Sequence, residues 1–363
     1  MGFPQSLFTF IIIIFSTITY QSQKVQSSPS QAETLLAIQR LLNYPPALSN
    51  WNNSTTDFCY TAPVLSLMVI CDENDAIIAL HIIGNSNRDN PSSYLPLINF
   101  SMETLVTTLA ALPALKRLTL SSLGLTGSLP AKISQLSSLE GLNLNSNFLR
   151  DPLPEELLSL HNLESISLDD NLFAGELPSW IGSLPALTSL SIKKNMFNGT
   201  LPDSITNLTN LESFTLARNY FQGNLPDFSR LKGLQVVDLE GNDFETECPC
   251  YLLGWNSMTV FDIGGNKFSG KLSESQSCGV GLEFVDLSSN FLTGNLPKCL
   301  AVKNSSRTVL FDGNCLKGTG DRTSLQRPLS YCDGQSSAGS RHISELLITI
   351  TTMIVLLVAG WIE

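Results

Sequence analysis

The feature that most constrains this chain is a repeat. Between Leu136 and Arg230 the sequence superimposes on itself every 24 residues, in four rows that begin at Leu136, Leu160, Leu184 and Leu208, the last one residue shorter. Each row follows the pattern L-x-x-L-x-x-[LIF]-x-[LI]-x-x-N-x-[LF]-x-[GD]-x-L-P. One such row cannot bury its apolar edge alone, so successive rows must stack as coils. The repeat therefore predicts a solenoid.

Each fixed position in the pattern has a physical role. Positions seven and nine alternate with outward neighbours, which predicts a short strand with positions six, eight and ten exposed. The asparagine at position twelve has an amide that can pair with backbone groups left open where the strand ends. Glycine permits a tight turn, and Leu-Pro closes the outer side of the coil. Stacked rows should thus form an α/β solenoid with a concave parallel β-sheet.

Eight such rows cover residues 112–302, and they begin at Leu112, Leu136, Leu160, Leu184, Leu208, Leu231, Trp255 and Gly279. Asparagine holds position twelve in seven of them, at Asn147, Asn171, Asn195, Asn219, Asn242, Asn266 and Asn290. Leu123 takes this position in the first row, so a ladder of asparagines should start one coil late. A period of about 20 to 29 residues with this leucine spacing is typical of a leucine-rich repeat.

The residues ahead of the rows predict a cap for the open end of the solenoid. Helical spacing of apolar residues from 31 to 42 is followed by Asn43 and two prolines, which end a helix. We assign 28–76 as an N-terminal cap that contains Cys59 and Cys71. Residues 77–111 form a first irregular coil, with a strand over 77–84 and a polar insertion over 85–101 that is either functional or mobile.

Composition and targeting signals predict an exported protein. Charged residues make up 15% of the chain and the formal net charge is -11, which argues against binding to nucleic acid. An apolar run over 7–18 predicts a signal peptide within residues 1–27. Six Asn-x-Ser/Thr triplets are candidate glycosylation sites, at Asn52, Asn53, Asn99, Asn198, Asn207 and Asn304.

Cysteines lie mostly at the two ends of the array, which predicts disulfide-linked caps. Residues 303–345 lose the repeat and should form a C-terminal cap and polar stalk. Its disulfide candidates are Cys278, Cys299, Cys315 and Cys332, which allow three connectivities. Cys248 and Cys250 form a C-x-C pair, and we interpret Cys248 as a small core residue or half of a structural bridge rather than a metal ligand.

Residues 346–362 are apolar and uncharged. At ~1.5 Å per residue a helix of this length covers about 25 Å, slightly less than the ~30 Å hydrocarbon core of a bilayer. The segment is either a transmembrane helix or the tail of a GPI-attachment signal. Both alternatives attach the solenoid to a membrane.

The sequence singles out no catalytic constellation. Its three histidines, His81, His161 and His342, do not accompany a recognisable nucleophile or carboxylate pair. We therefore expect no enzyme, no cofactor and no metal.

The exposed strand positions of the concave face are the predicted binding surface. Position eight holds Thr119, Asn143, Ser167, Ser191, Thr215, Asp238, Asp262 and Asp286, positions ten and eleven bring Asp169, Asp170, Lys193, Lys194 and Arg218, and position thirteen holds Phe148, Leu172, Met196 and Tyr220. One hypothesis is that a peptide or protein docks across rows two to six, anchored on position thirteen, with the three cations meeting its carboxylates. The alternative is that these cations pair with Asp169 and Asp170 on the next coil and that position thirteen merely shields the turn. A third possibility is that the three later aspartates face a basic segment.

The L-x-G-x-[IL]-P form of the repeat, behind an amphipathic helix, Trp51 and a cysteine pair, resembles the plant-specific class of leucine-rich repeat. The stretches 48–59, 282–290 and 292–299 are similar to ectodomains of plant leucine-rich repeat receptor-like kinases whose kinase is predicted inactive. This resemblance implies a right-handed superhelix, display at the plasma membrane, and an extracellular peptide or protein ligand with a possible co-receptor kinase. No kinase motif follows residue 335 in this sequence, so signalling would need a partner. The same class includes polygalacturonase inhibitors, which implies an inhibitor-type binding module as the alternative.

Overall fold

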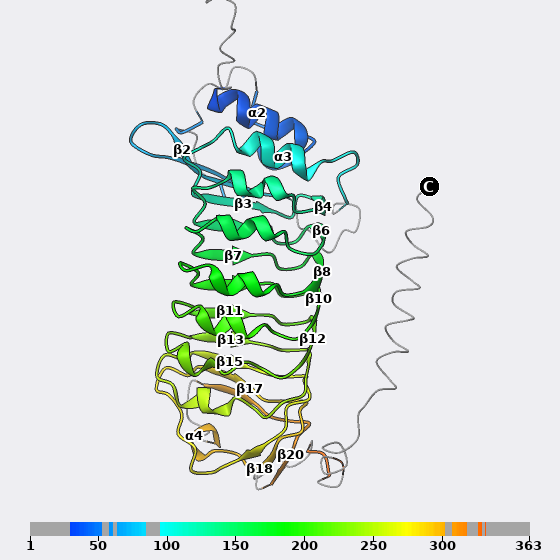
Figure 1. Cartoon of the computed structure of the whole chain (residues 1–363), viewed down its shortest axis with the longest axis vertical. Helices are drawn as coiled ribbons and strands as arrows, with labels where there is room; N and C mark the ends of the chain where they lie inside the picture. Colours follow the sequence, from blue (N-terminus) through cyan, green and yellow to red (C-terminus); the bar gives the residue numbers. More distant parts are fainter. Residues whose placement is uncertain are drawn as a thin grey trace, which may run out of the picture.

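A computed structural model describes residues 30–52, 58–60, 64–84, 95–301, 307–317, 326–328 and 331. These residues form one elongated stack of coils with a helical cap at the N-terminal end (Figure 1). The predicted signal peptide, the 346–362 segment, Asn53, Asn304 and Cys332 lie outside the described residues.

The N-terminal cap begins with helix α2 (Gln31–Leu41). The Ser30 side chain accepts a hydrogen bond from Glu33 N while the Glu33 carboxylate accepts one from Ser30 N, which closes the first turn. Strands β1 (Leu67–Cys71) and β2 (Ile77–Ile83) pair antiparallel, and the predicted disulfide joins Cys59 to Cys71. A short 3₁₀ helix, η1 (Pro46–Leu48), and helix α3 (Met102–Leu109) complete the cap and the first coil.

The concave sheet contains eleven strands, and from β2 onward all of its pairings are parallel. After β2 its strands are β3 (Arg117–Ser121), β5 (Gly141–Asn143), β7 (Ser165–Ser167), β9 (Ser189–Ser191), β11 (Ser213–Thr215), β13 (Val236–Asp238), β15 (Val260–Asp262), β17 (Phe284–Asp286) and β19 (Thr308–Leu310). The middle residue of each short strand from β5 to β17 is buried, as the repeat predicts. The concave parallel sheet is therefore confirmed.

A second, smaller sheet follows the turn of each coil. It consists of β4 (Thr126–Ser128), β6 (Phe148–Asp151), β8 (Leu172–Glu176), β10 (Met196–Gly199), β12 (Tyr220–Gly223) and β14 (Asp243–Phe244). A third sheet of β16 (Lys271–Leu272), β18 (Thr293–Asn295) and β20 (Cys315–Lys317) continues it. The outer side carries 3₁₀ helices η3 (Ala131–Gln135), η4 (Glu155–Ser159), η5 (Ser179–Ser183), η6 (Asp203–Asn207), η7 (Phe228–Arg230) and η8 (Cys250–Gly254), then helix α4 (Lys298–Ala301).

The core runs along the axis between these layers. Position fourteen supplies fully buried phenylalanines that stack from coil to coil with ring centroids 6.0–6.3 Å apart, namely Phe173, Phe197, Phe221, Phe244 and Phe268. Each coil thus shares its apolar interior with the next, which is how a short repeat obtains a core.

The position-twelve asparagines form the predicted ladder. Asn195 Nδ2 donates to the carbonyls of Leu168 (2.9 Å) and Ile192 (3.1 Å), and its Oδ1 accepts from Phe173 N at 3.1 Å. At the start of the ladder, where the first row has no asparagine, Asn147 Oδ1 accepts two backbone N–H groups. Buried backbone groups beside the strand ends are thereby paired.

The residue ahead of each ladder asparagine has a left-handed backbone in every row. Glycine occupies this position at Gly241 (φ 65°) and Gly265 (φ 64°), where the conformation is free of side-chain strain. Lys194 (φ 52°) and Arg218 (φ 59°) adopt the same left-handed conformation, although their side chains make it sterically unfavourable. The turn geometry therefore fixes these two cations at an energetic cost of about 1–2 kcal/mol each.

The structure continues the repeat into the segment assigned to the C-terminal cap. Strand β19 extends the concave sheet, and Asn314 repeats the ladder with bonds to Leu287 O (2.8 Å) and from Leu292 N (3.0 Å). Cys278 pairs with Cys299, and Cys315 is also disulfide-bonded. Cys248 forms a bridge with Cys250, which confirms the interpretation of Cys248 as half of a structural bridge, although neither residue was among the disulfide candidates. Cys250 is buried and Cys248 is half-buried.

Candidate functional site

Position eight forms one continuous column on the concave face. Parallel pairing aligns Asn143 with Ser167, Thr215 with Asp238, and so on along the sheet. The column ends beside His81 in β2 and Leu310 in β19, so the structure brings together all eight residues that the sequence placed there.

The polar residues of the middle coils are bonded to one another. Asn145 Oδ1 accepts hydrogen bonds from Asp169 N (2.7 Å) and Ser167 Oγ (2.9 Å). One coil on, Asp169 Oδ1 accepts from Lys193 N (2.7 Å) and Ser191 Oγ (2.6 Å). Asp169 therefore joins two coils, a structural role that its place among the ligand-binding candidates did not anticipate.

Two of the three candidate cations already have acidic partners. Lys193 Nζ lies 3.9 Å from Asp238 Oδ2, two coils further on, above a coil that has only Ala217 at position ten. Arg218 donates from Nε and from Nη2 to the Glu240 carboxylate, each at 3.2 Å. Hydrogen bonding and charge from Glu240 raise the Arg218 pKa. The cations thus pair toward the C-terminal coils rather than with Asp169.

Asp170 and Lys194 lie in the left-handed turns between the two sheets. Asp170 accepts a hydrogen bond from Ser146 Oγ at 3.1 Å. The Lys194 residue is exposed, so among the three cations it is the best placed to meet solvent or a ligand.

Three aspartates follow one another on adjacent strands β13, β15 and β17. Each carboxylate accepts a backbone N–H two residues on in its own coil, such as Gly264 N to Asp262 Oδ1 at 3.0 Å. Burial, with repulsion from Asp238 and Asp286, raises the pKa of Asp262 to about 7. Burial also raises the pKa of Asp238, partly offset by its bond with Glu240 N and by Lys193. A buried carboxylate with this pKa would be stabilised in its ionised form by an added cation.

Gly264 leaves room for this arrangement. A Cβ at Gly264 would lie 3.0 Å from Asp286 Cγ, so a larger residue there would press on the carboxylate. The half-buried apolar side chains Val236, Val260 and Phe284 line the same strands two residues earlier. The C-terminal half of the face therefore combines carboxylates with apolar surface.

The apolar column at position thirteen lies in a different sheet. Phe148, Leu172, Met196 and Tyr220 each begin a strand of the second sheet, beyond the asparagine ladder. Leu172, Met196 and Tyr220 are 43%, 38% and 50% exposed. They flank the concave face rather than forming part of its floor.

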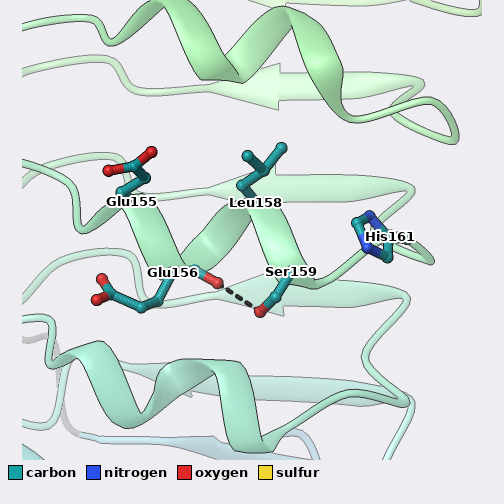
Figure 2. Close-up of a pocket in the computed structure, with 5 residues that line it drawn as sticks. All are labelled: Glu155, Glu156, Leu158, Ser159 and His161. Carbon is teal, nitrogen blue, oxygen red and sulfur yellow. Dashed lines mark hydrogen bonds between the residues drawn. The ribbon is translucent and has the colours of Figure 1, made fainter.

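A hollow of about 440 Å³ lies on the outer side, against η4. Figure 2 shows Glu155 and Glu156 at one end of η4 and His161 near the other, so their titratable groups do not converge. Within the described residues, no cluster of three or more His, Cys, Asp or Glu side chains has the arrangement of a metal site. The described part of the chain likewise contains no helix long and apolar enough to cross a bilayer.

Four of the six candidate glycosylation sites are described. Asn52, Asn99, Asn198 and Asn207 are exposed, and Asn207 lies at the end of η6. Asn198 lies within strand β10 of the second sheet.

The stacked coils, the asparagine ladder, the second sheet and the capped N-terminal end define a plant-type leucine-rich repeat solenoid. Family models agree: one described as "Leucine rich repeat N-terminal domain" matches residues 28–62, and one described as "Leucine Rich Repeat" matches 162–184, 186–208 and 281–302.

Among known proteins, the chain is 47% identical over 125 residues to a probable inactive leucine-rich repeat receptor-like protein kinase of Arabidopsis thaliana. That stretch spans 34% of this chain and only 14% of the relative. Among solved structures, a plant ice-binding protein matches with a TM-score of 0.66 and 27% identity, over 79% of this chain and 87% of that one. The complex of PEPR1 with AtPEP1 matches with a TM-score of 0.56 and 27% identity, over 79% and 45%. The resemblance to plant leucine-rich repeat ectodomains is thus confirmed.

Proposed function

We propose that this chain is a non-enzymatic receptor-like protein, attached to the plasma membrane, whose concave sheet binds an extracellular peptide or protein and which signals through a partner such as a co-receptor kinase. The single observation that carries the proposal is the continuous outward column of eleven paired strands, which offers an extended ligand one surface. Support comes from the neighbour solved as PEPR1 with AtPEP1 and from a peptide hormone receptor, RGFR1, solved with RGF2, at 26% identity and a TM-score of 0.51.

The charges on the face favour a ligand with a basic residue. Lys193 and Arg218 are engaged by Asp238 and Glu240, so a ligand carboxylate would have to displace these partners. Asp262 and Asp286 have backbone partners, but no salt bridge to either is present among the described residues. A lysine or arginine of the ligand over β15 and β17 would neutralise them, with its apolar neighbours against Val260 and Phe284.

Selection from a peptide-display library on the secreted ectodomain tests this proposal. We expect enriched peptides to carry Lys or Arg, and the double variant Asp262→Asn, Asp286→Asn to bind them at least about tenfold more weakly, a difference of about 1.4 kcal/mol. A matched double variant on the outer side, Glu155→Gln with Glu156→Gln, should bind like wild type. Peptides that bind both double variants equally would contradict the proposed surface.

Membrane attachment has a separate test. Fractionation of plant cells with and without a GPI-cleaving phospholipase distinguishes a spanning form, a lipid-anchored form and a soluble form. A wholly soluble form would favour the inhibitor-type module over the receptor-like protein.

Ice binding is a second candidate, because the middle of the concave sheet repeats small hydroxyls. Positions six and eight place them in register on three strands, at Ser165, Ser167, Ser189, Ser191, Ser213 and Thr215. Such an array repeats every ~4.8 Å across the strands, as a surface that matches a crystal lattice must. Against it, the hydroxyls of Ser191 and Thr215 already donate within the protein. Inhibition of ice recrystallisation that is lost in Ser189→Lys would support this candidate, and its absence in wild type would reject it.

A further inference from the structure

One candidate modification site, Asn198, lies beside the apolar column at position thirteen. Strand β10 alternates between outward Met196, buried Phe197 and outward Asn198, so Met196 and Asn198 project from the same face. Asn198 begins the triplet Asn198-Gly199-Thr200, whose glycine turns the chain with φ 73° directly after the acceptor.

The neighbouring strands place further residues around this asparagine. Asn198 pairs in register with Tyr220 of β12 on one side and with Glu176 of β8 on the other. Tyr220 is 50% exposed and Met196 38%, so the acceptor amide is bordered by a phenol ring and a thioether on one continuous surface. Paired residues on one face of a sheet lie about 5 Å apart, well within the reach of a single sugar ring.

We propose that Asn198 carries an N-linked glycan whose inner sugars lie over Met196 and Tyr220 and shield them from solvent. The acceptor step needs a lipid pyrophosphate-linked oligosaccharide as donor. The amide nitrogen forms the bond to the anomeric carbon as the bond from that carbon to the pyrophosphate oxygen breaks. The amide gives up one proton, and the lipid pyrophosphate leaves. The apolar faces of the sugars then cover the ring of Tyr220, which reduces its contact with water.

This arrangement changes the role of the apolar column at position thirteen. Met196 and Tyr220 then contact the protein's own glycan instead of anchoring a ligand. A ligand is therefore confined to the concave sheet. The inference does not rest on the proposed function, since it concerns only the second sheet, and it holds whether or not a peptide binds the concave sheet.

The test uses the full chain expressed in plant cells and mild peroxide oxidation of the folded protein. Glycan occupancy is read from the mass of the peptide that contains Asn198 after enzymatic release in heavy-oxygen water. Oxidation of Met196 is measured relative to Met68, which is equally exposed at 38% on β1, with buried Met258 as the unreactive reference. Because oxidation follows exposure, we expect the Met196-to-Met68 rate ratio to rise about twofold or more in Asn198→Gln.

Two further variants keep the result interpretable. Thr200→Ala removes the acceptor triplet but retains Asn198, and it should raise the ratio as Asn198→Gln does. Asn207→Gln removes the other described triplet of these coils, on η6, and should leave the ratio unchanged. An unoccupied Asn198, or an occupied Asn198 whose removal leaves the ratio at its wild-type value, would overturn the proposal. If peptide binding fails while the glycan shields Met196, only the proposed function is lost.

Discussion

The raised pKa of Asp262 makes a quantitative prediction for Asp262→Asn. The carboxyl has an ordinary pKa of 3.8 and a folded pKa of about 7, because burial and the flanking aspartates disfavour its ionised form. At a pH between these two values, the Asp262 carboxyl is protonated in the folded state and ionised in the unfolded state. Stability should therefore be fully present below pH 4 and fall as the pH rises through 7.

The size of the effect follows from that difference. Three pH units at about 1.36 kcal/mol each give about 4 kcal/mol as an upper bound. The side chain keeps part of its surface in water, which screens the repulsion, so we expect about 1–2 kcal/mol. Asp262→Asn should raise the free energy of unfolding by that amount at pH 8.5 and change it little at pH 3, below the ordinary pKa of 3.8.

Denaturant titration of both proteins at the two pH values measures this, with Glu156→Gln as a control for the loss of one exposed negative charge. Urea is suitable because it leaves the electrostatic repulsion unscreened by added salt. A gain in Asp262→Asn that is equal at pH 3 and pH 8.5 would refute the reasoning, because it would locate the effect in packing rather than ionisation.

Three further predictions concern the scaffold. Asn195→Ala leaves a buried backbone amide of the preceding coil without its side-chain acceptor and should lower the free energy of unfolding by about 2–4 kcal/mol, whereas exposed Asn210→Ala should cost about 0.5 kcal/mol or less in the same titration. Lys194→Gly should raise the melting temperature, by relief of about 1 kcal/mol of left-handed strain, while Lys194→Ala should not; equal values would show that the turn is unstrained. Gly182→Ala places a Cβ 2.1 Å from the carbonyl oxygen of Ser204 in the next coil, so it should destabilise the protein by more than 2 kcal/mol, on the order of an overpacked core site; a wild-type melting curve would exclude that close approach.

Much of the fold could be predicted from the sequence because a solenoid contact is a local rule repeated. The inward strand positions, the ladder that starts at Asn147, the N-terminal helix and the Cys59–Cys71 bridge all follow from spacing. The ninth coil was missed because polar residues, Lys303 and Ser306, hold positions one and four of its row, although Val309, Phe311, Asn314 and Leu316 continue the later part of the pattern.

The candidate site could be predicted less well, because its side-chain contacts join different coils and depend on how small the residues of the intervening coil are. Lys193 pairs with Asp238 across the coil that contains Ala217. The two residues are 45 positions apart in the sequence, so comparing neighbouring rows does not suggest this ion pair. Asp169 is an ordinary exposed charge in the pattern, yet backbone and hydroxyl donors of the next coil engage it. The second sheet was not expected as a separate surface, so position thirteen was grouped with the concave face.

These contacts divide the concave face into two halves with different demands on a ligand. In the middle coils, hydroxyls, Asn145 and Asp169 satisfy one another, so a ligand there gains contact area but few new polar bonds. Toward the C-terminal coils, Asp262 is held with a raised pKa, so an incoming cation gains both a charge partner and relief of the repulsion. A bound basic peptide would lower that pKa and release protons near pH 7, and its affinity should fall as the pH drops to 5. Isothermal titration of a selected basic peptide in two buffers of different ionisation enthalpy counts those protons. Their absence would show that the peptide binds away from β15, whatever its affinity.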